Sequence, residues 1–70
     1  MVPEINFEKG QSFYNHNRMK HHIIHVFEHL EEKIVVYKFW SKRRQRWFFE
    51  AKPQWSLRIS FAYGFQLISK

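Results

Sequence analysis

Four cationic side chains fall within five residues near the middle of the chain. They are Lys42, Arg43, Arg44 and Arg46. Tryptophan flanks this group on both sides, as Trp40 and Trp47. Cationic groups neutralise phosphates and release the counterions that condense on nucleic acid, and indole faces stack on unpaired bases with a gain of about 1–3 kcal/mol per base. The pattern therefore indicates a surface that can bind an anionic ligand through its cations and stack on flat rings of that ligand through its tryptophans.

The segments around these cations predict a β-hairpin that carries them at its tip. Both flanking segments, KIVVYKFW and RWFFEAK, are rich in the β-branched and aromatic residues typical of strands. If Ser41–Gln45 forms a five-residue loop, Trp40 opposes Arg46 and Lys38 opposes Phe48. This register would bring Lys38, Trp40 and Arg46 to the same side of the ribbon.

Because side chains alternate between the two faces of a strand, this register separates an apolar face from a mixed one. The apolar face, expected in the core, carries Val35, Tyr37, Phe39, Trp47, Phe49 and Ala51. The mixed face, expected in water, carries Val36, Lys38, Trp40, Arg46, Phe48 and Glu50. The residues predicted to bind nucleic acid or another partner are Lys38, Trp40, Lys42, Arg43, Arg44, Arg46 and Phe48.

A solvated hairpin turn is the alternative interpretation of the same cations, with Arg46 stacked on Trp40 as a cation–π pair. The RNA-recognition signature of a basic residue, a glycine and alternating aromatics is not met, because no glycine stands in this segment. The chain has only two glycines, Gly10 and Gly64, so it has no glycine-rich phosphate loop. Both interpretations of the basic segment stay open at this level.

The composition favours a binding protein with an anionic partner. The net charge of +6, with neutral histidines, attracts nucleic acid or an acidic protein, although it also keeps an aromatic-rich chain soluble. Eight Phe, three Trp and three Tyr exceed what one small core needs, and exposed aromatic patches mark protein partners. We therefore predict a non-catalytic nucleic-acid-binding module. The alternative is a small inhibitor or adaptor that binds an acidic protein, and a homodimer would use the same exposed rings.

No set of residues predicts an enzyme, a metal site or a cofactor. His21, His25 and His29 recur every four residues, and histidines four apart can bind zinc. However, the HHIIH segment has His where a metalloprotease has its Glu, and no cysteine can join. A chain of 70 residues hardly shapes the cleft that a pair of catalytic carboxylates needs. We expect instead that the five histidines make the charge depend on pH.

These features of the sequence predict a small cytoplasmic protein without a membrane partner. No apolar stretch approaches the ~20 residues of a membrane-spanning helix, and the first ten residues lack a signal-peptide pattern. The absence of cysteine fits a reducing compartment. Seventy residues make a single small domain, whose core must come from aromatic packing because no disulfide can stabilise it.

Residues 17–32 can be read either as a helix or as a strand. Their apolar positions follow a helical period, with Asn17 as a candidate N-cap. The density of β-branched and aromatic residues favours a strand, and the hairpin strand that follows directly supports it, because antiparallel neighbours often follow each other along the chain. In that case His29–Glu32 is the turn between the two strands.

The C-terminal part is predicted to form a short helix and a last strand. Ser56 is a suitable N-cap and Gly64 a suitable residue after the helix end, which favours a helix over a strand in residues 56–63. A strand at 65–69 would complete the sheet. Near the other end of the chain, Lys9–Gly10 predicts a turn beside one or two short strands.

A strand, an acidic turn, a Val-Val-Tyr strand and a Trp-bearing strand follow one another along residues 11–53. The sharpest points of this pattern are Val35–Val36–Tyr37 and Trp47. In this order of elements the chain resembles small SH3-like barrel proteins of unknown function from bacteria and phages. The resemblance implies a mainly β fold, a small antiparallel SH3-like open barrel of about five strands with one short helix near residues 56–63. It implies no activity. Together with the small size and the surplus of aromatic residues, the resemblance supports the alternative of a small phage-type inhibitor or adaptor that binds an acidic host protein through exposed aromatic residues.

Overall fold

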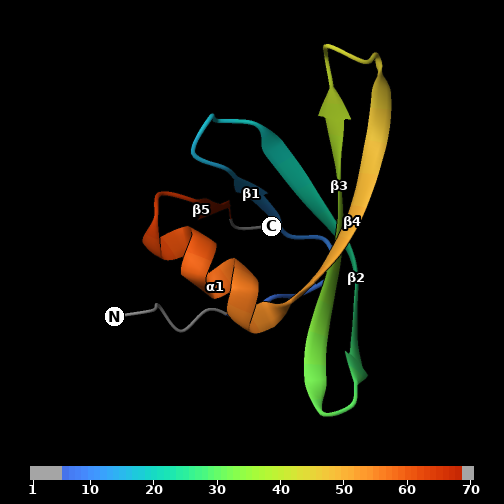
Figure 1. The fold of residues 1–70 in the computed structure, drawn as a ribbon, viewed down its shortest axis with the longest axis vertical. Coiled ribbons are helices and arrows are strands. Elements are labelled where there is room, and N and C mark those ends of the chain that lie inside the picture. Colours follow the sequence, from blue (N-terminus) through green and yellow to red (C-terminus); the bar gives the residue numbers. More distant parts are fainter. Residues whose placement is uncertain (1–5, 69–70) are drawn as a thin grey trace.

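An antiparallel sheet makes up most of the computed structural model, which describes residues 6–68. Its strands are β1 (Ser12–Tyr14), β2 (Lys20–His29), β3 (Glu32–Ser41), β4 (Arg46–Pro53) and β5 (Gln66–Ile68). Within the described range one helix, α1 (Gln54–Ala62), joins the last two strands (Figure 1). The order across the sheet is β4-β3-β2-β1-β5, and β4 and β5 form its two open edges. The predicted mainly β, open antiparallel fold with a short helix is confirmed.

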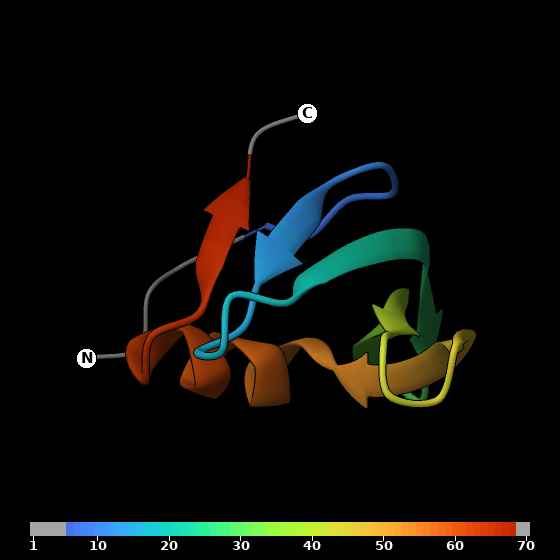
Figure 2. The same cartoon turned by 90° about the horizontal axis from the view of Figure 1, so that it is seen from above.

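The core lies between one face of the curled sheet and α1. Figure 2 shows α1 following directly from β4 and lying beneath β1 and β5 in that view. The buried apolar residues are Phe7, Phe13, Ile23, Val35, Tyr37, Leu57 and Phe61. Phe13 sits at their centre, with ring centroids 5.4 Å from Tyr37 and 5.6 Å from Phe61, both edge to face. Aromatic packing therefore supplies the core of this cysteine-free chain, as its composition predicts.

The segment that could be helix or strand is strand β2. It pairs with β3 through the predicted turn, and one residue is inserted between Ile23 and His25. Such a β-bulge leaves an unpaired residue and shifts the alternation of side chains beyond it. As a result His21 and Ile23 face the core on one side of the bulge, and Val26 packs against the core on the other.

The turn between β2 and β3 holds two consecutive residues in the left-handed backbone region. φ is 49° at Leu30 and 65° at Glu31, and His29 pairs with Glu32. A two-residue hairpin turn with positive φ at both positions is of type I′, which favours Asn-Gly. Leucine and glutamate are strained in this region because their β-carbons crowd the following carbonyl oxygen.

Replacing this pair by the turn's preferred residues, Leu30→Asn with Glu31→Gly, is expected to raise the free energy of unfolding by about 1 kcal/mol. The gain comes from relief of backbone strain, reduced by the extra freedom that glycine gives the unfolded chain. Urea unfolding with linear extrapolation measures it. The matched control, Leu30→Ala with Glu31→Ala, keeps both β-carbons and should bring no gain. Equal stability of the two double variants would show that the turn is not strained.

The helix ends where predicted but begins earlier. Gly64 has φ of +116° and its N–H donates to the Phe61 carbonyl at 3.2 Å, so it follows the helix end as expected. Ser56 is not the N-cap, because the helix starts at Gln54 with Pro53 in the capping position. The fixed ring of Pro53 sets its φ at −61°, which lets the chain enter the helix without a side-chain cap.

The two short terminal strands pair with each other at one side of the sheet. β5 lies antiparallel to β1, with Phe13 opposite Leu67. The last strand, predicted at 65–69, is therefore present over Gln66–Ile68. Ser69 lies outside the described residues. The turn at Lys9–Gly10 is present, and the start of the chain as far as Ile5 lies outside the described range.

Candidate functional site

The loop at the tip of the β3–β4 hairpin is one residue shorter than predicted. Ser41 pairs with Arg46 and Trp40 pairs with Trp47. The loop is therefore Lys42–Gln45, closed by the Gln45 N–H, which donates to the Ser41 carbonyl at 2.8 Å. Gln45 adopts a left-handed conformation with φ of 56°, which returns the chain into β4 without a fifth loop residue. The predicted five-residue loop and its register are wrong.

This shift by one residue exchanges the two faces of β4, because side chains alternate with a period of two. Phe48 stacks on Phe39 at 5.7 Å on the side of the core. Trp47, Phe49 and Ala51 point to the other side and are exposed, so their predicted place in the core is wrong. We call the side that carries Lys38, Trp40, Trp47 and Phe49 the outer face.

The predicted binding residues consequently divide into two groups on opposite sides of the hairpin. Lys38 and Trp40 lie on the outer face, and Phe48 lies on the other side with Arg46. The prediction that these four share one water-facing side is therefore wrong. Its cause is the loop length at the tip, since a five-residue loop would have brought them together.

Each group contains cations seated on aromatic rings. On the outer face Lys38 Nζ lies 4.6 Å from the centre of the Trp47 ring. On the opposite side the Arg46 guanidinium lies 4.5 Å and that of Arg44 5.7 Å from the Phe48 ring centre. We call Arg44, Arg46 and Phe48 the Phe48 cluster. The cation–π pair expected between Arg46 and Trp40 is replaced by these contacts.

A depression of about 610 Å³ opens on the outer face beside the hairpin tip. Its lining residues come from the loop before β2, the beginning of β2 and the end of the β3–β4 hairpin. Its basic lining residues are Arg18, Lys20, Lys42 and Arg43, and its ring-bearing ones are His22, Trp40 and Trp47. No carboxylate among the described residues lines it. We call it the tryptophan depression.

The two tryptophans stand at a steep angle to each other. Their ring centroids are 5.5 Å apart and their planes are inclined by 74°, an edge-to-face arrangement. Trp40 is 40% and Trp47 42% exposed, which is high for indole rings that pack against each other. The pair therefore offers water two adjoining ring surfaces set as the walls of a corner, and a contiguous aromatic patch of this kind marks binding surfaces.

The loop between β1 and β2 fixes one wall of the depression. Asn15 Oδ1 accepts hydrogen bonds from the N–H groups of Asn17 and Met19, both at 2.9 Å. The Arg18 N–H donates to the Asn15 carbonyl at 2.9 Å, and Arg18 has a left-handed φ of 61°. An arginine at a position that favours asparagine or glycine costs stability, and such residues gather at functional sites.

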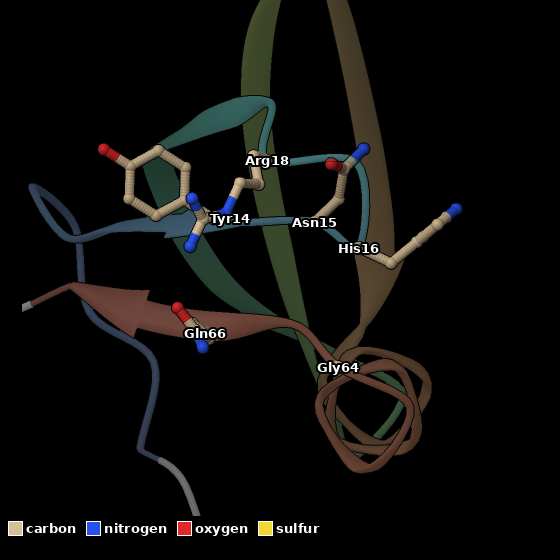
Figure 3. A pocket seen from close by; sticks show the side chains of 6 residues that line it. All are labelled: Tyr14, Asn15, His16, Arg18, Gly64 and Gln66. Carbon is tan, nitrogen blue, oxygen red and sulfur yellow. The ribbon is translucent and has the colours of Figure 1, made fainter.

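A smaller depression of about 430 Å³ lies on the other side of this loop, next to β5. Figure 3 shows the Arg18 side chain extending toward the ring of Tyr14, with Gln66 beside them. Arg18 lines both depressions, whereas Lys42 and Arg43 line only the tryptophan depression. Because the smaller depression has neither a tryptophan nor a second cation among its described lining residues, the larger one is the stronger candidate.

His22 completes the tryptophan depression as a neutral ring. Its ring lies 5.9 Å from that of Trp47, edge to face, and its Nδ1 lies 3.3 Å from the Ser12 hydroxyl. Burial, followed by the nearby cations Lys20 and Lys38, lowers the pKa of His22. At neutral pH the imidazole therefore offers a ring and a hydrogen-bonding nitrogen without a charge.

His21 points the other way and belongs to the core. Its ring lies 5.0 Å from that of Phe13 and 4.5 Å from that of Phe39, and its Nδ1 donates to the Met19 carbonyl at 2.9 Å. Burial lowers the pKa of His21, and this outweighs the opposing effects of the Met19 carbonyl and Glu50. Among residues 6–68 no three His or Glu side chains lie close enough to hold a metal ion together.

Stability is expected to fall when the pH is lowered from about 7 to about 5, because the unfolded chain then binds a proton that buried His21 resists. Because the pKa of His21 in the folded state is lower than the usual 6.5, the loss of stability begins as the pH falls through 6.5, where the unfolded chain takes up the proton. Urea unfolding at both pH values measures it. His21→Gln should flatten the dependence, whereas His25→Gln, at an exposed position, should not. An equal dependence in both variants would contradict the role of His21.

Comparison of the chain with protein-family models, with curated proteins and with solved structures finds no match in any of the three. The resemblance to SH3-like proteins therefore stays a prediction, and the functional argument rests on the side chains themselves. Within residues 6–68 the structure has no helix of the length and apolar character needed to cross a bilayer.

Proposed function

We propose that the protein is a non-catalytic nucleic-acid-binding module that uses the tryptophan depression and the cations at its rim. The observation that carries this proposal is the convergence of Lys20, Lys42 and Arg43 on a hollow walled by Trp40 and Trp47. Cations at the rim neutralise backbone phosphates, and the exposed indoles offer stacking surfaces. The Phe48 cluster adds positive charge at longer range from the other side of the hairpin.

The distribution of charge along the molecule supports this assignment. The tip with its cations lies at one end of the long axis, and the β2–β3 turn lies at the other end (Figure 1). That turn region carries the carboxylates Glu28, Glu31 and Glu32. An anionic chain is therefore attracted to the tip and repelled from the opposite end, which orients the encounter before contact.

The test is a polarisation assay with a labelled oligonucleotide over a series of salt concentrations. With three to four phosphates neutralised, the logarithm of the association constant should fall with the logarithm of the salt concentration with a slope of about −2 to −3. A protein that binds no oligonucleotide at about 20 mM salt, where electrostatic attraction is strongest, would refute the proposal. A slope near zero would show that phosphates are not the groups recognised.

A protein-binding inhibitor or adaptor is the second candidate, favoured by one observation. Phe49 is 63% exposed on the outer face, away from the cations of the tip, and Phe27 is 41% exposed. Such apolar exposure fits the contact surface of a protein partner. Phe49→Ser separates the candidates, since it should abolish a protein complex and leave oligonucleotide binding within about twofold.

A further inference from the structure

We infer that the tryptophan depression selects unpaired nucleotides, so that the ligand is a single strand with one base held against the two indoles. This inference rests on the proposed function and specifies its ligand. It depends on three features of the depression: its size, the arrangement of its rings and the place of its cations.

The size of the depression suits part of a single strand. Its volume of about 610 Å³ lies in the range of sites that enclose small organic ligands, about 300–1,000 Å³. A flat base with its sugar fits such a space. A base inside a duplex cannot enter it, because its faces are covered by the stacked neighbours and it must first leave the helix.

The arrangement of the rings favours stacking on a free base face. The planes of Trp40 and Trp47 are inclined by 74°, so a base stacked on one ring presents its edge to the other. Lys38 Nζ, 4.6 Å from the centre of the Trp47 ring, occupies part of this surface and can move to a phosphate when a base arrives. Stacking of this kind tolerates any base, since each has a π face.

The cations stand on two separate elements on either side of the rings. Lys20 begins β2, and Lys42 and Arg43 belong to the hairpin tip. A backbone that crosses the depression would therefore meet a positive group before and after the stacked base. This is the arrangement of single-strand binding grooves, in which charge follows the backbone and aromatic rings hold the bases.

Insertion of the hairpin into a duplex groove is the competing mode of binding, since a two-stranded ribbon fits the major groove. That mode would use the tip as a whole and would need polar side chains aimed at base edges. Instead the guanidinium groups of Arg44 and Arg46 lie over the Phe48 ring, and the outer side of the ribbon carries indoles. The observations therefore favour the single strand.

The experiment uses tryptophan fluorescence with the Trp55→Phe variant, so that only Trp40 and Trp47 emit. Trp55 is suitable for removal because it lies on α1, with its Nε1 donating to Glu32 at 3.3 Å, at a distance from the depression's lining. The probes are a thymidine oligomer of about 12 nucleotides, within the site sizes of single-strand binders, and a blunt duplex of the same length. We expect strong quenching and at least about tenfold tighter binding with the single strand.

Trp47→Ala should weaken binding of the single strand by about 10- to 100-fold, and Trp47→Phe, which keeps a ring, by less than about tenfold. Circular dichroism confirms that both variants are folded. Equal or tighter binding of the duplex, or binding without quenching, would overturn this inference and leave the proposed function standing. Absence of binding to both probes would refute the proposed function itself.

Discussion

Replacing Phe13 by alanine is expected to remove a large part of the free energy that stabilises the fold. Phe13 is fully buried, and its ring contacts those of His21, Tyr37, Phe61 and Phe65 at centroid distances between 5.0 and 5.8 Å. Truncation of such a phenylalanine costs about 3–5 kcal/mol. A domain of this length has a total stability of only about 4–10 kcal/mol, and no disulfide holds the chain if packing fails.

Circular dichroism and thermal unfolding measure the effect, with two substitutions for comparison. Phe13→Leu keeps most of the apolar volume and should cost about 1–3 kcal/mol. Leu67→Ala changes the residue opposite Phe13 in the β1–β5 register, which is 38% exposed, and should cost less than Phe13→Ala. A Phe13→Ala protein that unfolds within a few degrees of the wild type would show that the core is not centred on this ring.

The strands were predictable because their composition leaves few alternatives. Strand β3 combines β-branched and aromatic residues without a turn-forming residue before Ser41, and the acidic turn that precedes it joins it antiparallel to β2. The start of α1 was not predictable from Ser56, because Pro53, with a fixed φ and no side-chain cap, occupies the capping position. Capping preferences therefore located the end of this helix, at Gly64, better than its beginning.

The register of β4 could not be read from its side chains. Trp47, Phe48 and Phe49 are consecutive aromatics, so each of the two possible registers places apolar rings on both faces. Hydrogen bonds at the tip decide between them, in particular those that Ser41 accepts from Arg44 N–H through its hydroxyl, at 3.2 Å, and from Gln45 N–H through its carbonyl. Sequence patterns of alternation contain no information on such local contacts.

Only about half of the residues in the candidate site were predicted, for a similar reason. The sequence placed Lys38, Trp40, Lys42 and Arg43 on a binding surface, but it missed four lining residues of the depression: Arg18, Lys20, His22 and Trp47. If the pairing of β2 with β3 continued from the turn without a bulge, His21 would lie opposite Trp40 on the outer face and His22 would face the core. The inserted residue after Ile23 reverses this order, and no signal in the sequence reveals it. The loop asparagines before Arg18 were the one available sign of a turn there.

The largest loss of oligonucleotide affinity is expected from Lys42→Glu combined with Arg43→Glu, by about 100-fold or more at about 50 mM salt. Both side chains line the tryptophan depression, so their reversal removes phosphate contacts and places two carboxylates at its rim. The polarisation assay measures the loss. The slope of the salt dependence should become shallower by the amount that about two phosphate contacts contribute. Since both residues are exposed in the loop, the folded state should change by less than about 0.5 kcal/mol.

Arg44→Glu combined with Arg46→Glu is the matched comparison, because it changes the net charge by the same amount within the same hairpin. These two arginines lie over Phe48, on the side away from the depression, so their reversal should act only through the long-range field and cost about tenfold or less. Equal losses in the two double variants would mean that net charge alone sets the affinity. A larger loss in the second would move the binding surface to the Phe48 cluster. Because the two pairs are neighbours in sequence and differ in the side of the ribbon they occupy, only the observed register predicts that their effects differ.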